Sequence, residues 1–187
     1  MIFYIHGFNS SASSSTGRLL AEQAGRPVRC LEWDCADPYK ANMDRLGNDI
    51  FLYSDCFDVI VGTSMGGFYA LALAKELGQC CVAFNPVTEP KAQLKGMLGR
   101  QVNFSTGREW EFTQDILDTY PDSIDIGAGV PAAAFVSKED EILKDNFRIA
   151  SRHLKECIPT KEAHRIKDFT PYIDTILRYE NILGAAL

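Results

Sequence analysis

The stretch that decides the fold reads VGTSMGGFYALALAKELG and spans residues 61–78. It overlaps DVIVG (58–62), whose three β-branched residues are typical of a buried strand. Residues 67–78 are rich in Ala and Leu and end at a glycine, which predicts a helix. Between the strand and the helix lies Gly-Thr-Ser-Met-Gly, a G-x-S-x-G pattern. The stretch therefore predicts a sharp strand-to-helix turn with Ser64 at its apex.

The two glycines of this pattern have a physical reason. A serine presented at such a turn has strained backbone angles, and side chains two residues before and after it would collide with the crossing strand and helix. Gly62 and Gly66 fill those positions. Ser64 would stand at the helix N-terminus, where the Met65 N–H and the helix dipole favour negative charge. We therefore expect Ser64 to be a nucleophile and the Met65 N–H to be an oxyanion donor.

The rest of the chain alternates short apolar runs with helical segments. This alternation predicts an α/β fold in a single domain of 187 residues, with a mostly parallel central sheet and helices on both faces. We expect strands at 2–5, 27–33, 58–62, 79–84, 132–136 and 157–162, and helices at 18–25, 38–54, 67–78, 146–156 and 168–183. The serine-rich stretch 9–17 suits a loop that caps the first helix.

One segment, residues 86–128, departs from this alternation. It has mixed polarity and three prolines, and it exceeds the usual connection of about 2–6 residues plus a helix. We expect an inserted cap over the sheet edge, with an ordinary crossover helix and a long loop as the alternative. Its apolar residues would line an acyl pocket or simply pack the cap against the sheet; they are Met97, Leu98, Phe104, Trp110 and Phe112.

Composition and charge exclude several classes of function. A net charge of −6 and a pI of about 5.1 argue against a nucleic-acid partner, which would require a basic face. The chain has no run of about 18 apolar residues, so we expect no stable insertion into a membrane. Its start, MIFYIHGF, lacks a basic region and a cleavage site, so we expect no signal peptide and a cytoplasmic protein.

The six cysteines contain no C-x-x-C pair and have no histidine cluster near them. We therefore expect no zinc site, and neither another metal nor an organic cofactor. Cys80 and Cys81 lie in an apolar run that is typical of a buried strand. Free and mostly buried thiols are the expected state.

A serine hydroxyl needs a general base, and the chain has three histidines. The expected order is nucleophile, acid, histidine. His6 precedes Ser64, and we expect it to hold its own loop by hydrogen bonds. His153 lies in a charged helical stretch, where we expect it to face solvent. His164 lies between the last strand and the last helix and is the predicted base.

The acid should follow a strand between the serine and the base. Strand 132–136 is followed by SKEDEIL, which is also typical of a solvated acidic turn. Of Glu139, Asp140 and Glu141 we select Asp140, because many hydrolases of this type place the acid in an acid-acid-aliphatic-aliphatic sequence. Glu139 is the fallback. The acid would orient the imidazole and stabilise its protonated form.

A second oxyanion donor should come from the loop that follows the first strand. This loop reads His-Gly-Phe-Asn, and Gly7 lets its backbone approach a substrate closely. We select the Phe8 N–H as the donor, with Asn9 as the second choice.

These residues resemble a known family through IHGFNSS (5–11), GTSMGGFYA (62–70), FNPVTEP (84–90), DEIL (140–143) and the late histidine. Together they resemble the small bacterial α/β-hydrolase esterases of the YqiA/YcfP type over residues 5–164. The resemblance implies a compact α/β-hydrolase fold and activity on small-molecule acyl esters or thioesters. Ser64, Asp140 and His164 match the positions of that family's catalytic triad.

The leading hypothesis is therefore a serine esterase that works through an acyl-enzyme. An acyl-CoA thioesterase is the nearest rival, because four basic residues of the insertion could form a rim for its phosphates: Lys91, Lys95, Arg100 and Arg108. The same residues are also typical of a solvated face. A hypothesis from another class is a binding or regulatory module that keeps the fold without turnover. A phosphate site in loop 9–17 ranks lower, because that loop lacks the lysine of a P-loop.

Overall fold

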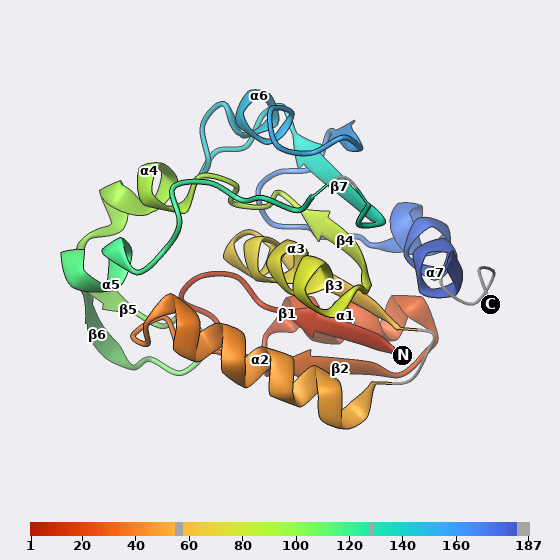
Figure 1. Ribbon diagram of the computed structural model, residues 1–187, viewed down its shortest axis with the longest axis horizontal. Coiled ribbons are helices and arrows are strands. Elements are labelled where there is room, and N and C mark those ends of the chain that lie inside the picture. The colour runs from red at the N-terminus through yellow and green to blue at the C-terminus, as the bar shows by residue number, and fades with distance from the viewer. Residues whose placement is uncertain (55–57, 128, 183–187) are drawn as a thin grey trace.

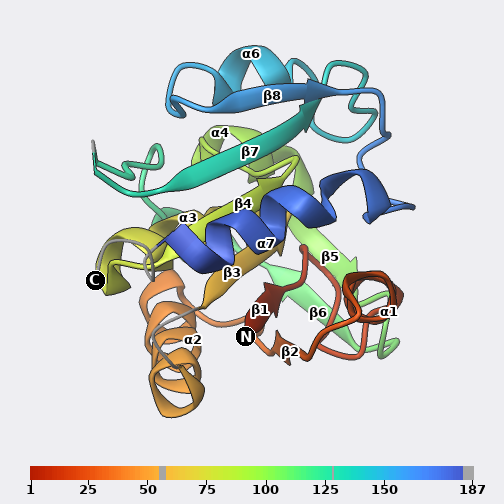
Figure 2. The same cartoon turned by 90° about the vertical axis from the view of Figure 1, so that its right-hand side faces the viewer.

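The computed structural model describes residues 1–54, 58–127 and 129–182, with side chains as far as residue 180. Its main sheet has six parallel strands in the order β2-β1-β3-β4-β7-β8. Figure 1 labels the strands of this sheet from β2 to β7, and Figure 2 also labels β8. The strands are β1 (Ile2–Ile5), β2 (Val28–Leu31), β3 (Val59–Thr63), β4 (Cys80–Phe84), β7 (Ala132–Ser137) and β8 (Cys157–Thr160). The parallel sheet expected from the alternating pattern is confirmed.

Helices cover both faces of this sheet (Figure 2). They are α1 (Ser15–Ala24), α2 (Tyr39–Tyr53), α3 (Met65–Leu77), α6 (Asn146–Ala150) and α7 (Ile173–Ile182), which follows the short 3-10 helix η2 (Thr170–Tyr172). Leu20 of α1 and Ile176 of α7 pack in one apolar cluster, and Leu46 of α2 and Leu71 of α3 pack in the other. Because both faces are covered, the central strands are apolar runs rather than alternating ones.

Three helices differ from the expected bounds by more than two residues. The last helix begins at Ile173 rather than at residue 168, because the 3-10 turn η2 precedes it. The first begins at Ser15 rather than at residue 18, because Ser14 caps it by accepting a hydrogen bond from the Gly17 N–H at 3.3 Å. The helix expected at 146–156 ends at Ala150. Beyond it, the N–H groups of Arg152 and His153 donate to the carbonyls three residues back, at 3.1 and 3.0 Å, so the chain continues in tighter turns than an α-helix.

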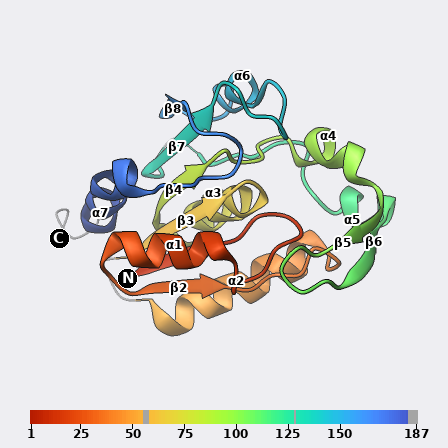
Figure 3. The same cartoon turned by 180° about the vertical axis from the view of Figure 1, so that it is seen from behind.

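The segment 86–128 contains no single crossover helix. It forms α4 (Pro90–Leu94), a 3-10 turn η1 (Lys95–Met97), an antiparallel hairpin of β5 (Gly99–Val102) and β6 (Glu109–Phe112), and α5 (Gln114–Asp118). These elements gather beyond the ends of the parallel strands, on the left in Figure 1 and on the right in Figure 3. The hairpin contacts the loop after β1 through the Phe104 N–H and the Asn9 carbonyl, at 2.7 Å.

Candidate active site

The turn between β3 and α3 holds Ser64 in an unusual backbone conformation, with φ 55° and ψ −121°. A positive φ is uncommon for a residue with a Cβ atom and indicates local strain. A Cβ added to Gly62 would lie 2.2 Å from the Gly66 carbonyl oxygen, and one added to Gly66 would lie 2.1 Å from the Ile5 carbonyl oxygen. Both obstacles are backbone atoms, so the expected reason for the two glycines is confirmed.

Backbone hydrogen bonds hold this conformation. The Ser64 N–H donates to the Phe84 carbonyl at 2.9 Å. The Ser64 carbonyl accepts from the N–H groups of Gly67 at 2.9 Å and Val87 at 3.1 Å. Strands β3 and β4 and helix α3 therefore fix the turn together, and these bonds offset a strain of about 1–3 kcal/mol. The hydroxyl of Ser64 is left to face the pocket described below.

The loops after β7 and β8 bring Asp140 and His164 together. The imidazole Nδ1 lies 2.9 Å and 2.8 Å from the two carboxylate oxygens of Asp140. The Asp140 side chain is 1% exposed, and its Oδ1 accepts from the N–H groups of Ile142 at 2.9 Å and Leu143 at 2.7 Å. A carboxylate fixed in this way orients the ring and stabilises its protonated form.

Glu139, the fallback acid, does not reach the imidazole. Its side chain is exposed, and its backbone N–H donates to the Ser137 hydroxyl at 3.0 Å. Glu141 instead contacts the backbone of the histidine, because its Oε2 accepts from the His164 N–H at 2.8 Å. That hydrogen bond lowers the pKa of Glu141 below its ordinary value.

The motifs predicted no role for Asn85, the residue that joins the loop of Asp140 to the loop of His164. Asn85 is fully buried and has a φ of 44°. Its amide Nδ2 donates to the carbonyls of Ala163 at 3.0 Å and His164 at 2.8 Å, and its Oδ1 accepts from the Ser137 N–H at 2.7 Å. An asparagine directly before a proline, at the end of a buried strand, is the signal that could have identified it.

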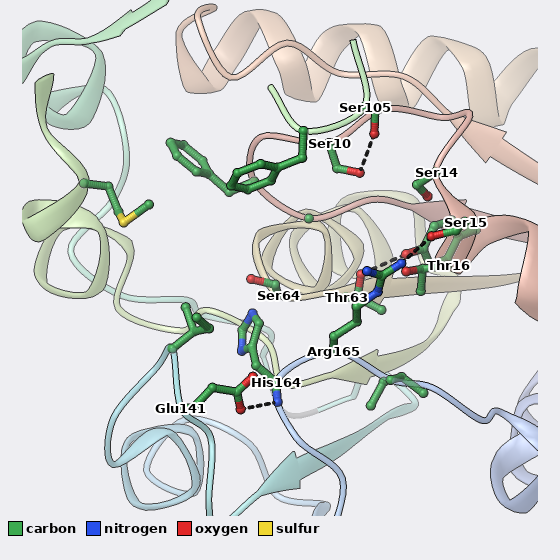
Figure 4. Close-up of a pocket in the computed structure, with 17 residues that line it drawn as sticks. Ser10, Ser14, Ser15, Thr16, Thr63, Ser64, Ser105, Glu141, His164 and Arg165 are labelled. Atoms are coloured by element: carbon green, nitrogen blue, oxygen red, sulfur yellow. Dashed lines mark hydrogen bonds between the residues drawn. The ribbon is translucent and has the colours of Figure 1, made fainter. Parts of the chain in front are cut away.

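Ser64 and His164 line one pocket of about 520 Å³. Figure 4 shows the imidazole of His164 beside Ser64, with Glu141 on the far side of the ring. The described side chains of Ser64 and His164 form no direct hydrogen bond with each other in this structure. Such contacts are often long in sites that hold no substrate, and they shorten when the substrate binds.

The loop after β1 crosses the pocket close to the serine. A Cβ added to Gly7 would lie 3.4 Å from the Cβ of Ser64. The Asn9 N–H donates to the Cys35 sulfur at 3.2 Å, whereas the Phe8 N–H has no hydrogen-bond acceptor among the described residues. Met65 is the first residue of α3, where backbone N–H groups have no partner within the helix. Phe8 and Met65 thus both offer backbone N–H groups close to Ser64.

The other two histidines, His6 and His153, differ in how they are buried and bonded. His6 is fully buried, its Nε2 lies 3.1 Å from Glu32 Oε1, and its ring stacks on Trp33 at 5.4 Å. The structural role expected for His6 is confirmed. The expectation that His153 faces solvent is wrong: its side chain is 19% exposed, and its Nε2 lies 2.9 Å from Glu89 Oε1. Because α6 ends at Ala150, the following turn directs His153 toward the insertion.

No disulfide joins the cysteines in the described ranges, where Cys80 and Cys81 are fully buried. Burial raises the pKa of Cys35 to about 12. Cys56 lies outside the described residues. Among the described side chains, no group of three or more histidine, cysteine or acidic residues is placed to hold a metal ion. Of the helices that the structure describes, none is long and apolar enough to cross a membrane.

Solved structures share this architecture. Est1E from Butyrivibrio proteoclasticus matches with a TM-score of 0.70 at 15% sequence identity, over 98% of this chain and 88% of that chain. An extracellular α/β-hydrolase from a Paenibacillus species also matches with a TM-score of 0.70, at 13% identity, over 96% of this chain and 98% of that one. These likenesses confirm the expected α/β-hydrolase fold.

Proteins related in sequence match this chain over nearly its whole length. A UPF0227 protein of Vibrio parahaemolyticus is 24% identical over 189 residues, which cover 97% of this chain and 99% of that protein. One from Yersinia enterocolitica is also 24% identical, with the same shares covered. The family model described as "Uncharacterised protein family (UPF0227)" matches residues 1–181. The resemblance that the motifs predicted is thereby confirmed, and the chain belongs to the UPF0227 family, on an α/β-hydrolase fold.

Proposed function

We propose that this protein is a serine hydrolase that cleaves carboxylic esters through an acyl-enzyme. The observation that carries the proposal is a serine on a strained turn that shares a pocket with an imidazole, whose Nδ1 is bonded to a buried carboxylate. A hydroxyl, a base and an acid that orients the base are the three groups that nucleophilic acyl transfer requires.

In the proposed reaction, Ser64 Oγ attacks the carbonyl carbon of the ester while His164 Nε2 accepts the hydroxyl proton. The carbonyl oxygen becomes an oxyanion, which the N–H groups of Phe8 and Met65 stabilise. The bond to the alcohol oxygen then breaks, and His164 donates its proton to the leaving alcohol. Water attacks the acyl-enzyme by the same route in reverse and releases the acid. Asp140 keeps the imidazole oriented throughout.

The names of the structural neighbours agree with an ester substrate. Est1E has been solved with ferulic acid bound, and another neighbour is named as an esterase from Pyrobaculum calidifontis. The thioesterase hypothesis has less support, because three of the four basic residues proposed for a CoA rim bond to carboxylates. Lys91 pairs with Asp122, Arg100 with Glu109 and Arg108 with Asp34.

The test is labelling and turnover. Wild-type protein is treated with a fluorophosphonate, the modified residue is located by mass spectrometry, and hydrolysis of p-nitrophenyl butyrate is measured. We expect a single label on Ser64, and a loss of at least about 10³-fold in kcat for Ser64→Ala and for His164→Ala, because coupled catalytic groups act as a unit. Ser151→Ala is the matched control, because Ser151 is exposed and does not line the pocket.

An unlabelled wild-type protein without turnover would contradict the proposal and favour the binding-module hypothesis. Turnover that survives Ser64→Ala would instead assign the reaction to another residue.

A further inference from the structure

The lining of the pocket is chemically divided. Hydroxyl groups from the loop before α1, from the first turn of α1 and from the end of β3 line one part of it, together with one arginine. Figure 4 shows Ser14, Ser15, Thr16, Thr63 and Arg165 together on one side of Ser64. The apolar residues of the lining are Phe8, Met97, Phe104, Ile142 and Ile166.

Arg165 follows His164 directly, and its guanidinium donates a hydrogen bond to the Ser15 hydroxyl. Within the part of the chain that the structure describes, no carboxylate lies within ion-pair distance of it. Some other arginines are paired with carboxylates: Arg26 binds Glu180 at 2.5 Å, and Arg100 binds Glu109 at 2.5 Å. An unpaired guanidinium beside a nucleophile leaves several N–H donors for a ligand.

Glu141 is the acidic residue of the lining, and it does not neutralise Arg165. Its carboxylate accepts from the His164 N–H, and Figure 4 shows Glu141 and Arg165 on opposite sides of that histidine. The hydroxyls near Arg165 are hydrogen-bond donors without charge, and the Tyr4 hydroxyl is held within this group by Thr63 at 2.9 Å. The local surroundings of Arg165 therefore favour an anion, in a protein whose net charge is −6.

We propose that the substrate is an ester that carries a negatively charged oxygen group, a carboxylate or a phosphate, and that Arg165 binds this group together with the hydroxyls of Ser15 and Thr16. The proposal rests on the proposed function, since it names the substrate class for the same site. A guanidinium suits this task because it donates two parallel hydrogen bonds to a carboxylate or phosphate. The apolar side chains would contact the uncharged part of the ester.

Two matched pairs of esters test this. For a charge on the acyl side, p-nitrophenyl hexanoate is compared with the mono-p-nitrophenyl ester of hexanedioic acid, which replaces the terminal methyl by a carboxylate. For a charge on the alcohol side, the butyrate ester of methyl 3-hydroxybenzoate is compared with that of 3-hydroxybenzoate. The readout is the ratio of kcat/KM, charged over neutral, in wild type and in Arg165→Gln, Arg165→Lys and Arg178→Gln.

We expect the ratio to fall about tenfold or more in Arg165→Gln for one of the two pairs, as for the loss of charge-assisted hydrogen bonds. Arg165→Lys should keep part of the ratio because it keeps the charge, and Arg178→Gln, an exposed arginine on α7, should keep all of it. The pair that responds identifies the side of the ester that carries the charge.

A ratio that is the same in wild type and Arg165→Gln for both pairs overturns the inference and leaves the proposed function intact. The inference is also overturned if Arg165→Gln slows both members of each pair equally, because Arg165 would then only hold the loop of His164 through Ser15. If wild type cleaves none of the four esters and Ser64 is not labelled, the proposed function fails and the inference fails with it.

Discussion

The turn at Ser64 and the hairpin of β5 and β6 are held in place by different means. At the turn, backbone atoms pack so closely that Gly62 and Gly66 cannot gain a side chain. The hairpin has more open surroundings: a Cβ added to Gly99 would have no neighbour within 4 Å, and Phe104 is 83% exposed. The parallel sheet thus sets the geometry of the proposed chemistry, and the exposed end of the hairpin, at Phe104, supplies part of the wall that a substrate meets.

The two regions meet at Asn9. Its Nδ2 donates to Gln101 Oε1 at 2.8 Å, and its Oδ1 accepts from the indole N–H of Trp110 at 2.8 Å. Its N–H is bonded to Cys35, and its carbonyl accepts from Phe104. This buried residue with a φ of 56° is the neighbour of Phe8. The attachment of the hairpin and the proposed oxyanion donor therefore depend on the same loop.

The largest effect is a loss of activity, which we expect from Asp140→Asn in the rigid region around the turn at Ser64. Asparagine keeps an oxygen to accept from Ile142 and Leu143 but cannot stabilise a protonated imidazole. We expect kcat for ester hydrolysis to fall at least about 10³-fold while the melting temperature changes little. Glu139→Gln, which removes the adjacent exposed acid, should retain the activity. Equal losses in the two variants would contradict the assignment of Asp140.

The next largest effect concerns stability, which we expect to fall in Gly66→Ala. The new Cβ would lie 2.1 Å from the Ile5 carbonyl oxygen, so a strand or a helix would have to shift. We expect the free energy of unfolding to fall by about 3 kcal/mol or more, measured by urea denaturation. Gly96→Ala, where an added Cβ meets nothing within 4 Å, is the control. A Gly66→Ala protein as stable as wild type would show that the turn tolerates movement.

A smaller effect on the rate is expected from Asn9→Gly, which tests the junction between the two regions. Glycine accepts the positive φ but removes both side-chain bonds to the hairpin. We expect kcat to fall about tenfold, because the neighbouring Phe8 N–H loses its fixed position. Arg108→Gln breaks only an exposed ion pair between the hairpin and Asp34, and should leave kcat within about twofold. Similar losses in both variants would contradict the special role of Asn9.

The smallest effect concerns pH and Glu141. The His164 N–H lowers the pKa of Glu141 in the folded state, so this contribution to stability is present above the unfolded pKa of about 4.3. It is lost as the pH falls through the lower, folded-state pKa. In Glu141→Gln, the decrease in melting temperature between pH 6 and pH 3 should therefore be slightly smaller than in wild type. An equal or larger decrease in the melting temperature of Glu141→Gln would contradict a stabilising role for ionised Glu141.

The sequence predicts the core of the site because its signals are local. The glycine spacing around Ser64, the fully apolar strands β1 and β4, and the acidic residues after β7 each lie within a few residues of the feature that they indicate. The hairpin was missed because β5, with the sequence GRQV, presents polar residues on an open surface. Its turn carries Gly107 at a φ of 71°, a signal that could have indicated it.

The long-range hydrogen bonds of the asparagine side chains were missed for another reason. Asn85 bonds to carbonyls 78 and 79 residues further along the chain, and Asn9 bonds to Gln101, 92 residues away. No local sequence pattern encodes such a contact, because asparagine is common in turns of many kinds, whatever its long-range partners. His153 belongs to the same class, since Glu89, its partner, is 64 residues distant in sequence.

The insertion contributes no strand to the main sheet and none of the three side chains proposed for catalysis. The proposed catalytic groups and the segment that shapes part of the pocket are therefore separate stretches of the chain. A lineage could exchange the hairpin, and with it the apolar contact of Phe104, while Ser64 and its partners keep their positions. The constraints on such an exchange are that the new segment must match the side chain and the carbonyl of Asn9 with polar groups, and must fill the core position of Phe112, which is 1% exposed. Protein engineers could use the same junction to graft new substrate-binding loops onto an unchanged reaction centre.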